Sequence, residues 1–377
     1  MRGDEYQELV DEIGALLGTP ATLEDRDFRL IAFGAHEGAA PEAAVDPVRA
    51  HSILRRRSEP AVREWFEGFG IATAAGPVRV PAQPAAGVLT GRICLPARAG
   101  GVVRGYVWVL DNDPPAPRLA ASMAVAGRIG ALLAGEARAG ARLGELLAAA
   151  LAPGAPGASE ELAAALGPAA GEPLALLAVT PWDAERPPPA LPPGALALCA
   201  PRPLGAWAVP PAGGGRLAAL ARAAAARAVA GGLRGPGAVA GVAAARRGVA
   251  GLPAAWREAV AAARAARAER RFGGVAEWAA LGPYRLLTAL PGGAAPDPAV
   301  RALLRPENAP LARTAETFLD HAGHPGRAAE ALGIHRQTLY YRLNRIARLT
   351  GLDLDRGPDR LLLHMSLKAA RLDDGPA

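Results

Sequence analysis

The sequence predicts a multidomain α+β protein, in which two mixed regions of strands and helices precede an all-α C-terminal region. The chain has 377 residues, which is enough for two or three domains of ordinary size. Strand-like apolar runs alternate with helical stretches up to about residue 290. Beyond residue 296 the apolar residues recur at the three- and four-residue spacing of helices. We expect segments at 1–113, 114–153, 154–295 and 296–377.

Residues 1–113 read as a small antiparallel sheet with flanking helices. An opening helix carries Leu9, Val10 and Ile13 on one face, and residues 19–34 read as strand, turn and strand. A helical stretch covers residues 48–69. Two further strands, GRICLPAR and VVRGYVWVLD, follow it and are joined by two glycines. This order of elements fits a PAS- or GAF-like sensor domain.

Aromatic side chains in this first segment have two readings. They can wall a site for a small-molecule effector, or they can simply form the core of a small sheet domain, which is the commoner case. These residues are Trp65, Phe66, Phe69, Tyr106 and Trp108. His36 and His51 stand without a cysteine or other ligand pattern nearby, so no metal, haem or other cofactor is expected.

A long helix is predicted from about residue 118 to residue 151, within the segment 114–153. It follows the turn-like string DNDPPAP and contains Leu132, Leu133, Leu143, Leu146 and Leu147. Such a helix can pair with its counterpart in a dimer and connect a sensor to its output. The alternative is a helix that only caps the first segment.

Residues 154–295 predict a small α/β domain. Strands are expected at PLALLAVT, ALALCAP, GAWAVPP and AVAGVAA, and helices at residues 216–230 and 253–271. From Arg186 to Arg257 the chain has no Asp or Glu, so the carboxylates that hold catalytic metal ions are missing. The glycines at 213–215 lack the lysine and hydroxyl of a P-loop. We therefore expect no enzyme, and a dimerisation or relay role for this segment.

Residues 323–351 predict two helices joined by a tight turn. Pro325 suits the first turn of a helix, and Gly333 stands where the first helix must end with a positive φ. In the second helix, residues 336–349, Leu339, Leu343 and Ile346 form one buried stripe. This is the pattern of a DNA-binding helix-turn-helix.

Polar and aromatic residues of the second helix fall opposite its buried stripe. In a helix-turn-helix the N-terminal residues of this helix enter the major groove, where arginine pairs with guanine and glutamine with adenine. Arginines further along are expected at phosphates. The candidate DNA-binding residues are His335, Arg336, Gln337, Thr338, Tyr340, Tyr341, Asn344, Arg342, Arg345 and Arg348. The alternative is an ordinary amphipathic helix pair with a solvated basic face.

The string AAEALGIHRQTLYYRLNRIARLTGLDL closely resembles the C-terminal helix-turn-helix of PucR/CdaR-type bacterial transcriptional regulators. The resemblance extends over residues 311–372, and Gln337 departs from the asparagine that the family more often has. Upstream, GVAEWAALGPYRLLTAL and LPAAWREAVAAARAA resemble the end of the GGDEF-like domain of CdaR-type regulators, with Trp256 in place of a common tyrosine. The GGDEF string itself is absent. The resemblance implies a degenerate GGDEF-like domain in the middle of the chain.

The composition adds little to this interpretation. The net charge is +6 and the pI about 10.0, but Lys368 is the sole lysine, which indicates arginine bias from a GC-rich genome. Residues 311–372 carry ten Lys or Arg and six Asp or Glu, a net charge of +4. The N-terminus does not resemble a signal peptide, and no uncharged apolar run of membrane-spanning length occurs. Cys94 and Cys199 read as buried free thiols.

These observations predict a cytoplasmic, sequence-specific transcriptional regulator. Its expected partners are double-stranded DNA, a second copy of itself or a higher homo-oligomer, and a small-molecule effector at the N-terminal domain, with no membrane. The alternative is a signalling or scaffold protein whose C-terminal helices bind a protein partner.

Overall fold

The structure is a computed structural model that divides into two compact units, residues 1–139 and 140–377. It describes residues 2–34, 53–55, 60–84, 88–152, 154–155, 157–183, 188–201, 215–289 and 297–373. The first unit contains mixed helices and strands. The second contains an α/β region followed by helices alone, so the expected combination of mixed regions and a helical C-terminal region is confirmed.

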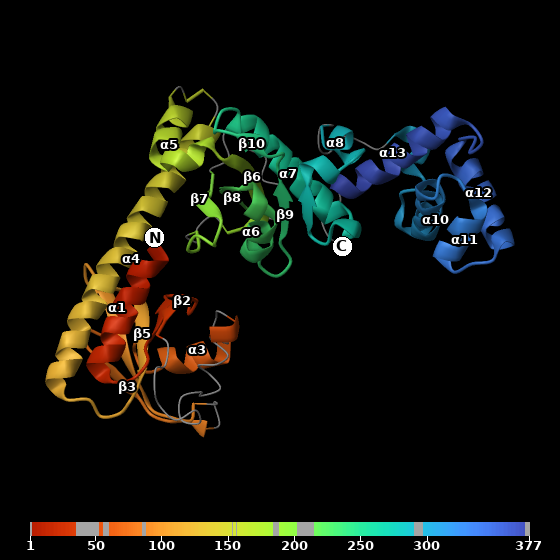
Figure 1. Cartoon of the computed structure of the whole chain (residues 1–377). Helices are drawn as coiled ribbons and strands as arrows, with labels where there is room; N and C mark the ends of the chain where they lie inside the picture. The colour runs from red at the N-terminus through yellow and green to blue at the C-terminus, as the bar shows by residue number, and fades with distance from the viewer. Residues whose placement is uncertain are drawn as a thin grey trace. The chain divides into compact units, whose positions relative to one another are not determined.

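The first unit, coloured red to yellow in Figure 1, is built on one antiparallel sheet. Its strand order is β2-β1-β5-β4-β3. Its elements are α1 (Arg2–Leu17), β1 (Thr22–Asp25), β2 (Leu30–Phe33), α3 (Pro60–Glu67), β3 (Val78–Val80), β4 (Arg92–Ala99), β5 (Val102–Leu110) and α4 (Ala116–Leu151). The predicted opening helix, hairpin and strand pair all form, and the short strand β3 is an addition to the prediction. Part of the helix expected at residues 48–69 lies outside the described residues, as do His36 and His51.

The α1 and α4 helices cover one face of this sheet. Val10 and Ile13 of α1 and Ile129 of α4 are fully buried against the strands. Arg128 and Glu12 join the two helices at their surface with a 2.9 Å ion pair. This face has the apolar side chains of both helices as its core, which the spacing in the sequence predicted for α1.

Four of the five aromatic residues that the sequence singled out pack on the opposite face, while Phe69 is 36% exposed. Phe66 of α3 and Trp108 of β5 have ring centroids 4.4 Å apart, and both are buried. The Trp108 Nε1–H donates to the buried Glu24 carboxylate over 3.1 Å, so its polar atom is satisfied. Tyr106 belongs to the same cluster, while Trp65 lies at its edge. The described part of this face is therefore an aromatic core.

The α4 helix is long and apolar enough to cross a membrane by length and composition alone, with a mean hydropathy of 1.3 over its most apolar stretch. A third of that stretch, 33%, is buried inside the protein, and this test of length and composition is also met by the core helices of soluble proteins. Ala126 and Ile129 pack on the sheet of the first unit, and Leu147 is buried in the second unit. The helix has protein neighbours along both ends, so this test is weak evidence for a membrane.

The α/β region of the second unit is built on a sheet with the order β11-β9-β6-β8-β7, and β10 pairs with β6. The neighbours are antiparallel except β9 and β11, which are parallel. The helical elements are α5 (Ala158–Leu166), η2 (Gly167–Gly171), η4 (Ala223–Ala225), α6 (Ala226–Leu233), α7 (Leu252–Ala268), η5 (Arg270–Phe272), η6 (Trp278–Ala280) and α8 (Tyr284–Leu287). The strands are β6 (Pro173–Trp182), β7 (Ala195–Cys199), β8 (Gly215–Arg222), β9 (Val239–Val242), β10 (Arg246–Arg247) and β11 (Val275–Glu277).

The prediction of a helix from residue 216 onward was wrong for its first half. Residues 215–222 form β8, which pairs with both β6 and β7, and the α6 helix begins only at Ala226. Leu217 and Leu220 are buried on opposite faces of the sheet. Alanine, leucine and arginine favour helices locally, but two strand neighbours and burial on both faces outweigh that preference. The strand expected at GAWAVPP lies outside the described residues.

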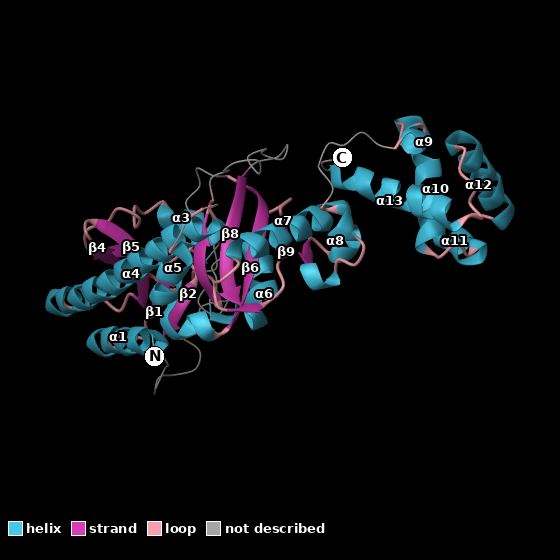
Figure 2. Cartoon of the chain, turned by 90° about the horizontal axis from the view of Figure 1, so that it is seen from above, coloured by secondary structure: helices cyan, strands magenta, loops and turns pink. Residues whose placement is uncertain are grey.

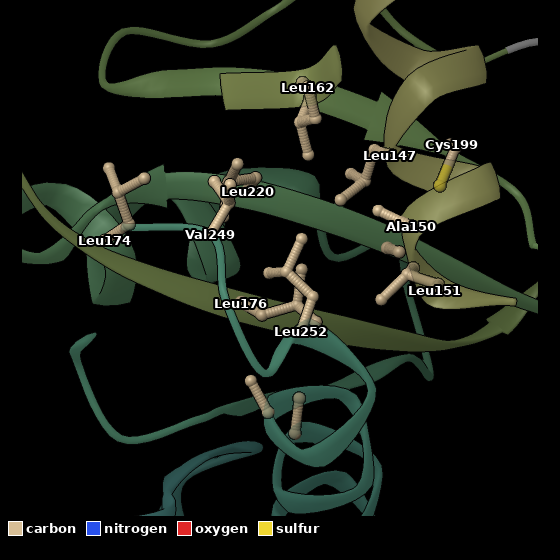
Figure 3. Close-up of a cluster of buried hydrophobic side chains, with 14 of the residues drawn as sticks. Leu147, Ala150, Leu151, Leu162, Leu174, Leu176, Cys199, Leu220, Val249 and Leu252 are labelled. Carbon is tan, nitrogen blue, oxygen red and sulfur yellow. The ribbon is translucent and has the colours of Figure 1, made fainter. Parts of the chain in front are cut away.

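Leucine and alanine fill the core on one face of this sheet. Figure 3 shows Leu174, Leu176 and Leu220 from the strands meeting Leu147 and Leu252 from the flanking helices. Cys199 lies in this cluster, and burial raises the pKa of its thiol to about 12. Cys94 is also a buried free thiol whose pKa burial raises, as expected from the apolar runs that contain both cysteines.

The helical end of the second unit comprises α9 (Pro298–Arg301), η7 (Pro306–Asn308), α10 (Ala309–Asp320), α11 (Pro325–Leu332), α12 (Arg336–Thr350) and α13 (Gly357–Asp373). Figure 2 shows α10, α11 and α12 grouped together, with α13 extending from this group to α8. Leu363 and Leu367 of α13 are buried in the same cluster as Leu339 of α12. The α13 helix thus belongs both to the helical group and, at its C-terminal end, to the α/β region.

Candidate nucleic-acid interface

The turn between α11 and α12 is fixed by backbone geometry at Gly333. Its φ of 63° lies in the left-handed region, and its N–H donates to the Glu330 carbonyl over 3.0 Å. The Ile334 N–H donates to the Ala329 carbonyl over 3.0 Å, which closes the end of the helix. The expected glycine turn is therefore present.

His335 caps the start of α12. Its backbone is extended, and its Nδ1 accepts the Gln337 N–H over 3.3 Å. A side chain that accepts this N–H satisfies one of the donors that a helix start leaves unpaired. The first residues of α12 are thereby held in helical geometry at the end that, in this motif, approaches DNA.

A small apolar core holds the two helices together. Ala328 and Ala329 of α11 are buried, and their short side chains leave room for Leu339 of α12, which is fully buried. Leu343 and Ile346 continue the buried stripe, as the sequence predicted. Phe318 of α10 contributes to the same cluster. The apolar packing on its inner side thus holds α12 against α11 and α10.

The outer side of α12 carries nine of the ten candidate residues in exposed positions. Tyr340 is 48% exposed and Tyr341 is 64% exposed, although both are large and aromatic. The exposed candidates are His335, Arg336, Gln337, Thr338, Tyr340, Tyr341, Asn344, Arg345 and Arg348. Exposed aromatic and amide side chains beside arginines present stacking surfaces and hydrogen-bond donors together, and such a set can contact base edges and phosphates.

Arg342 is the candidate that the structure sets apart from the others. It is half-buried, and its Nη1 donates to the Oγ1 of Thr314 on α10 over 3.2 Å. The Thr314 hydroxyl in turn donates to the Pro310 carbonyl over 2.8 Å. Arg342 therefore bridges the second helix to α10, a contact that the sequence did not predict because Thr314 lies 28 residues away.

The electrostatic balance of α11 and α12 favours an anionic partner. From Pro325 to Thr350 the chain has five arginines and one acidic residue, Glu330. Arg327, on the exposed side of α11, was not among the predicted site residues. Its position in the first helix of the motif could have predicted a phosphate contact, because that helix crosses the DNA backbone in other helix-turn-helix proteins.

Among the described residues, no group of three or more His, Cys, Asp or Glu side chains could hold a metal ion. His321 and His324 flank the turn before α11. The His321 Nδ1 lies 2.8 Å from the Thr317 carbonyl, and His324 is the residue before the first turn of α11.

Comparison with known proteins identifies the helical end. Residues 311–369 match the family of the PucR C-terminal helix-turn-helix domain. Over 71 residues the chain is 46% identical to the carbohydrate diacid regulator of Escherichia coli (strain K12), a match that spans 19% of this chain and 18% of that protein. The resemblance to PucR/CdaR-type regulators is therefore confirmed for the C-terminal helices.

A solved structure, the regulator of polyketide synthase expression from Bifidobacterium adolescentis, is also similar. It shares 22% sequence identity, and the match covers 57% of this chain and 86% of that one. The TM-score is 0.23, so the fold of the preceding regions is not assigned from this likeness.

Proposed function

We propose that this chain is a sequence-specific DNA-binding transcriptional regulator that places α12 in the major groove. The observation that carries the proposal is the outer side of α12, where exposed polar and aromatic residues stand on a helix held by a core on its other side. The matches to the PucR C-terminal domain and to the carbohydrate diacid regulator support it. The family match covers residues 311–369, and the match to the carbohydrate diacid regulator covers only 19% of this chain and 18% of that protein, so the role of the whole chain is a proposal.

The proposed contacts divide along α12. Arg336 and Gln337, in its first turn, would read base edges, with Tyr340 and Tyr341 beside them. Arg345 and Arg348 lie about two and a half and three turns beyond Arg336 and would contact phosphates, which position the helix without reading sequence. Arg327 of α11 would add a phosphate contact. Arg342 is assigned to holding α12 on α10, because its guanidinium already bonds Thr314.

The regions before the helix-turn-helix would supply signal input and dimerisation. We propose a PAS- or GAF-like sensor domain at residues 1–113, a connecting helix at 114–153, a degenerate GGDEF-like domain at 154–295 and the DNA-binding domain at 296–377. A dimer would read two half-sites about 34 Å apart, one turn of DNA. The protein would act in the cytoplasm, with a small-molecule effector at the first domain.

The test is selection of duplexes from random sequence by the full-length protein, followed by binding measured at several salt concentrations. We expect a recovered motif with two related half-sites, and an affinity that falls steeply with salt because phosphate contacts release counterions. The competing function is a scaffold whose C-terminal helices bind a protein. Failure to recover any motif, with affinity for DNA that barely responds to salt, would favour that alternative.

A further inference from the structure

We propose that four charged residues couple the α/β region of the second unit to the DNA-binding helices. They are Glu269, Glu316, Lys368 and Arg371, called here the coupling cluster. The proposal rests on the proposed function, because DNA is the ligand whose binding it would transmit. The four residues come from the end of α7, from α10 and from α13.

The distances place Lys368 and Arg371 of α13 between two carboxylates. The Lys368 Nζ lies 2.7 Å from Glu316 Oε1 and 3.7 Å from Glu269 Oε1. The Arg371 Nη1 donates to Glu269 Oε1 over 2.8 Å, and its other terminal nitrogen pairs with Glu316. Each cation therefore touches both carboxylates, one from the α/β region and one from α10.

Three of the four side chains of the coupling cluster are largely removed from solvent. Those of Lys368, Glu269 and Glu316 are 12%, 10% and 7% exposed, whereas that of Arg371, at the rim, is 44% exposed. At its margins Arg271 lies 3.4 Å from Glu269, and Asp320 accepts from Lys368 over 3.0 Å. Three cations thus face three carboxylates. Buried charges are tolerated when they are paired in this way, and the pairing specifies one arrangement of the elements that carry them.

A line of contacts continues from the coupling cluster to the proposed recognition helix. Glu316 and Thr314 are on the same helix, α10, two positions apart. Thr314 accepts the hydrogen bond of Arg342, which belongs to α12. A displacement of Glu269 would therefore change the ion pairs of Lys368 and Arg371. Because both cations also pair with Glu316, the position of α10 would change, and that of α12 with it through Arg342 and Thr314.

Apolar contacts around the charges hold α13 against both the α/β region and the helix-turn-helix. Ala369 and Leu372 of α13 pack on a cluster that includes Ala262 of α7 and Leu287 of α8. Further toward its N-terminus, α13 places Leu363 in the core of the helix-turn-helix. One helix thus has its two ends in two different cores, with the coupling cluster at the C-terminal one.

The experiment measures hydrogen exchange in the full-length protein with and without DNA. The probe is a duplex of about 40 base pairs recovered by the selection, long enough for two half-sites one turn apart. In the wild-type protein we expect DNA to slow exchange in α12, where it binds. We also expect it to slow exchange at residues 262–272 by about fivefold or more, the lower end of ordinary coupling between sites.

Two variants interrupt the cluster, and one serves as a control. Glu269→Gln keeps the side-chain shape and removes the charge that faces α13, while Lys368→Met keeps the stem and removes the central cation. In both we expect DNA to slow exchange in α12 but no longer at residues 262–272. Arg285→Met, an exposed position of α8, removes one cation from the same region and should behave as wild type.

Each outcome decides a different point. If DNA protects α12 in the wild-type protein but leaves residues 262–272 unchanged, the coupling does not exist. Protection of residues 262–272 that survives in Glu269→Gln would show that these charges do not carry it. If Lys368→Met does not fold, Glu269→Gln decides the question. No protection of α12 itself would overturn the DNA-binding function, and the coupling with it.

Discussion

Arginines on α12 differ in what their side chains face, although the sequence presents them as one basic set. Arg336, Arg345 and Arg348 are exposed, whereas Arg342 is half-buried and bonded to Thr314. The helical period could place Arg342 off the outer side, but its partner lies on another helix and leaves no local signal. Residue type and spacing predicted the exposed set, and only the packed structure separates the bridging arginine from it.

Arg348 is expected to contact phosphate. Arg348→Ala should weaken binding to all duplexes alike and reduce the slope of log affinity against log salt by about 0.9, the share of one phosphate contact. The measurement is affinity for specific and unrelated duplexes over a salt series. A loss confined to the selected duplex would instead assign Arg348 to base reading.

Arg342 is expected to act through Thr314. Arg342→Met should lower the free energy of unfolding by about 1 kcal/mol, the ordinary net value of a hydrogen bond, and leave the salt slope of DNA binding unchanged. Thr314→Val should have a similar effect, and the two should not add. Chemical denaturation of the single and double variants measures this. Additive losses, or a slope reduced as for Arg348, would contradict the bridging role.

Asp320 makes the stability of the helical end depend on pH in the acid range. Burial alone would raise the pKa of Asp320, but hydrogen bonds from His364 and Lys368 outweigh it and lower the pKa from its ordinary value of 3.8 to about 2. A lowered folded-state pKa stabilises the protein above pH 3.8, and this contribution is lost as the pH falls toward 2. The Asp320 side chain is 41% exposed, so solvent screening keeps the effect small.

The corresponding variant is Asp320→Asn. We expect it to lower stability at neutral pH and to flatten the decline between pH 3.8 and about 2, because the amide does not titrate. Thermal unfolding across this range, compared with wild type, is the measurement. If the variant lost stability between pH 3.8 and about 2 as steeply as the wild-type protein, other carboxylates would cause that loss.

At the scale of the element, the sequence predicted α11, α12 and their turn because their determinants are local. Proline at the start, glycine at the end and leucines four apart each act within one helix. The β8 strand was mistaken for a helix because its strand state depends on β6 and β7, which lie elsewhere in the chain. Local preference is decisive where packing is one-sided and is overridden where an element is buried on both faces.

Substitution of Gly333 tests whether the turn between α11 and α12 requires a positive φ. A Cβ added there would meet no atom within 4 Å, so the cost of Gly333→Ala comes from the positive φ of 63° alone. Placing alanine in the left-handed region costs about 1–2 kcal/mol. Denaturant unfolding should show that loss. Gly326→Ala, a helical position on α11 with equal space and no positive φ, is the control and should be neutral or stabilising. Equal effects at both positions would contradict the argument.

At the scale of the whole molecule, the coupling cluster was beyond the reach of sequence reasoning. Glu269 and Arg371 are 102 residues apart, and no motif marks either of them. The core of the helix-turn-helix was foreseeable from apolar spacing, but its connection through α13 to the cluster at α7 and α8 is a property of the folded chain. The molecule therefore has a proposed DNA-reading helix, α12, and a proposed route, the coupling cluster, by which the α/β region can affect that helix.

The central claim is that α12 reads DNA sequence, and the most direct test is the affinity of the full-length Arg336→Ala, Gln337→Ala double variant for the selected duplex. We expect Arg336→Ala alone to cost about 1–3 kcal/mol in specific binding. The double variant should bind the selected duplex little better than an unrelated one, while its salt dependence persists through the remaining phosphate contacts. Full affinity and full discrimination in the double variant would contradict the claim that this helix is the base reader.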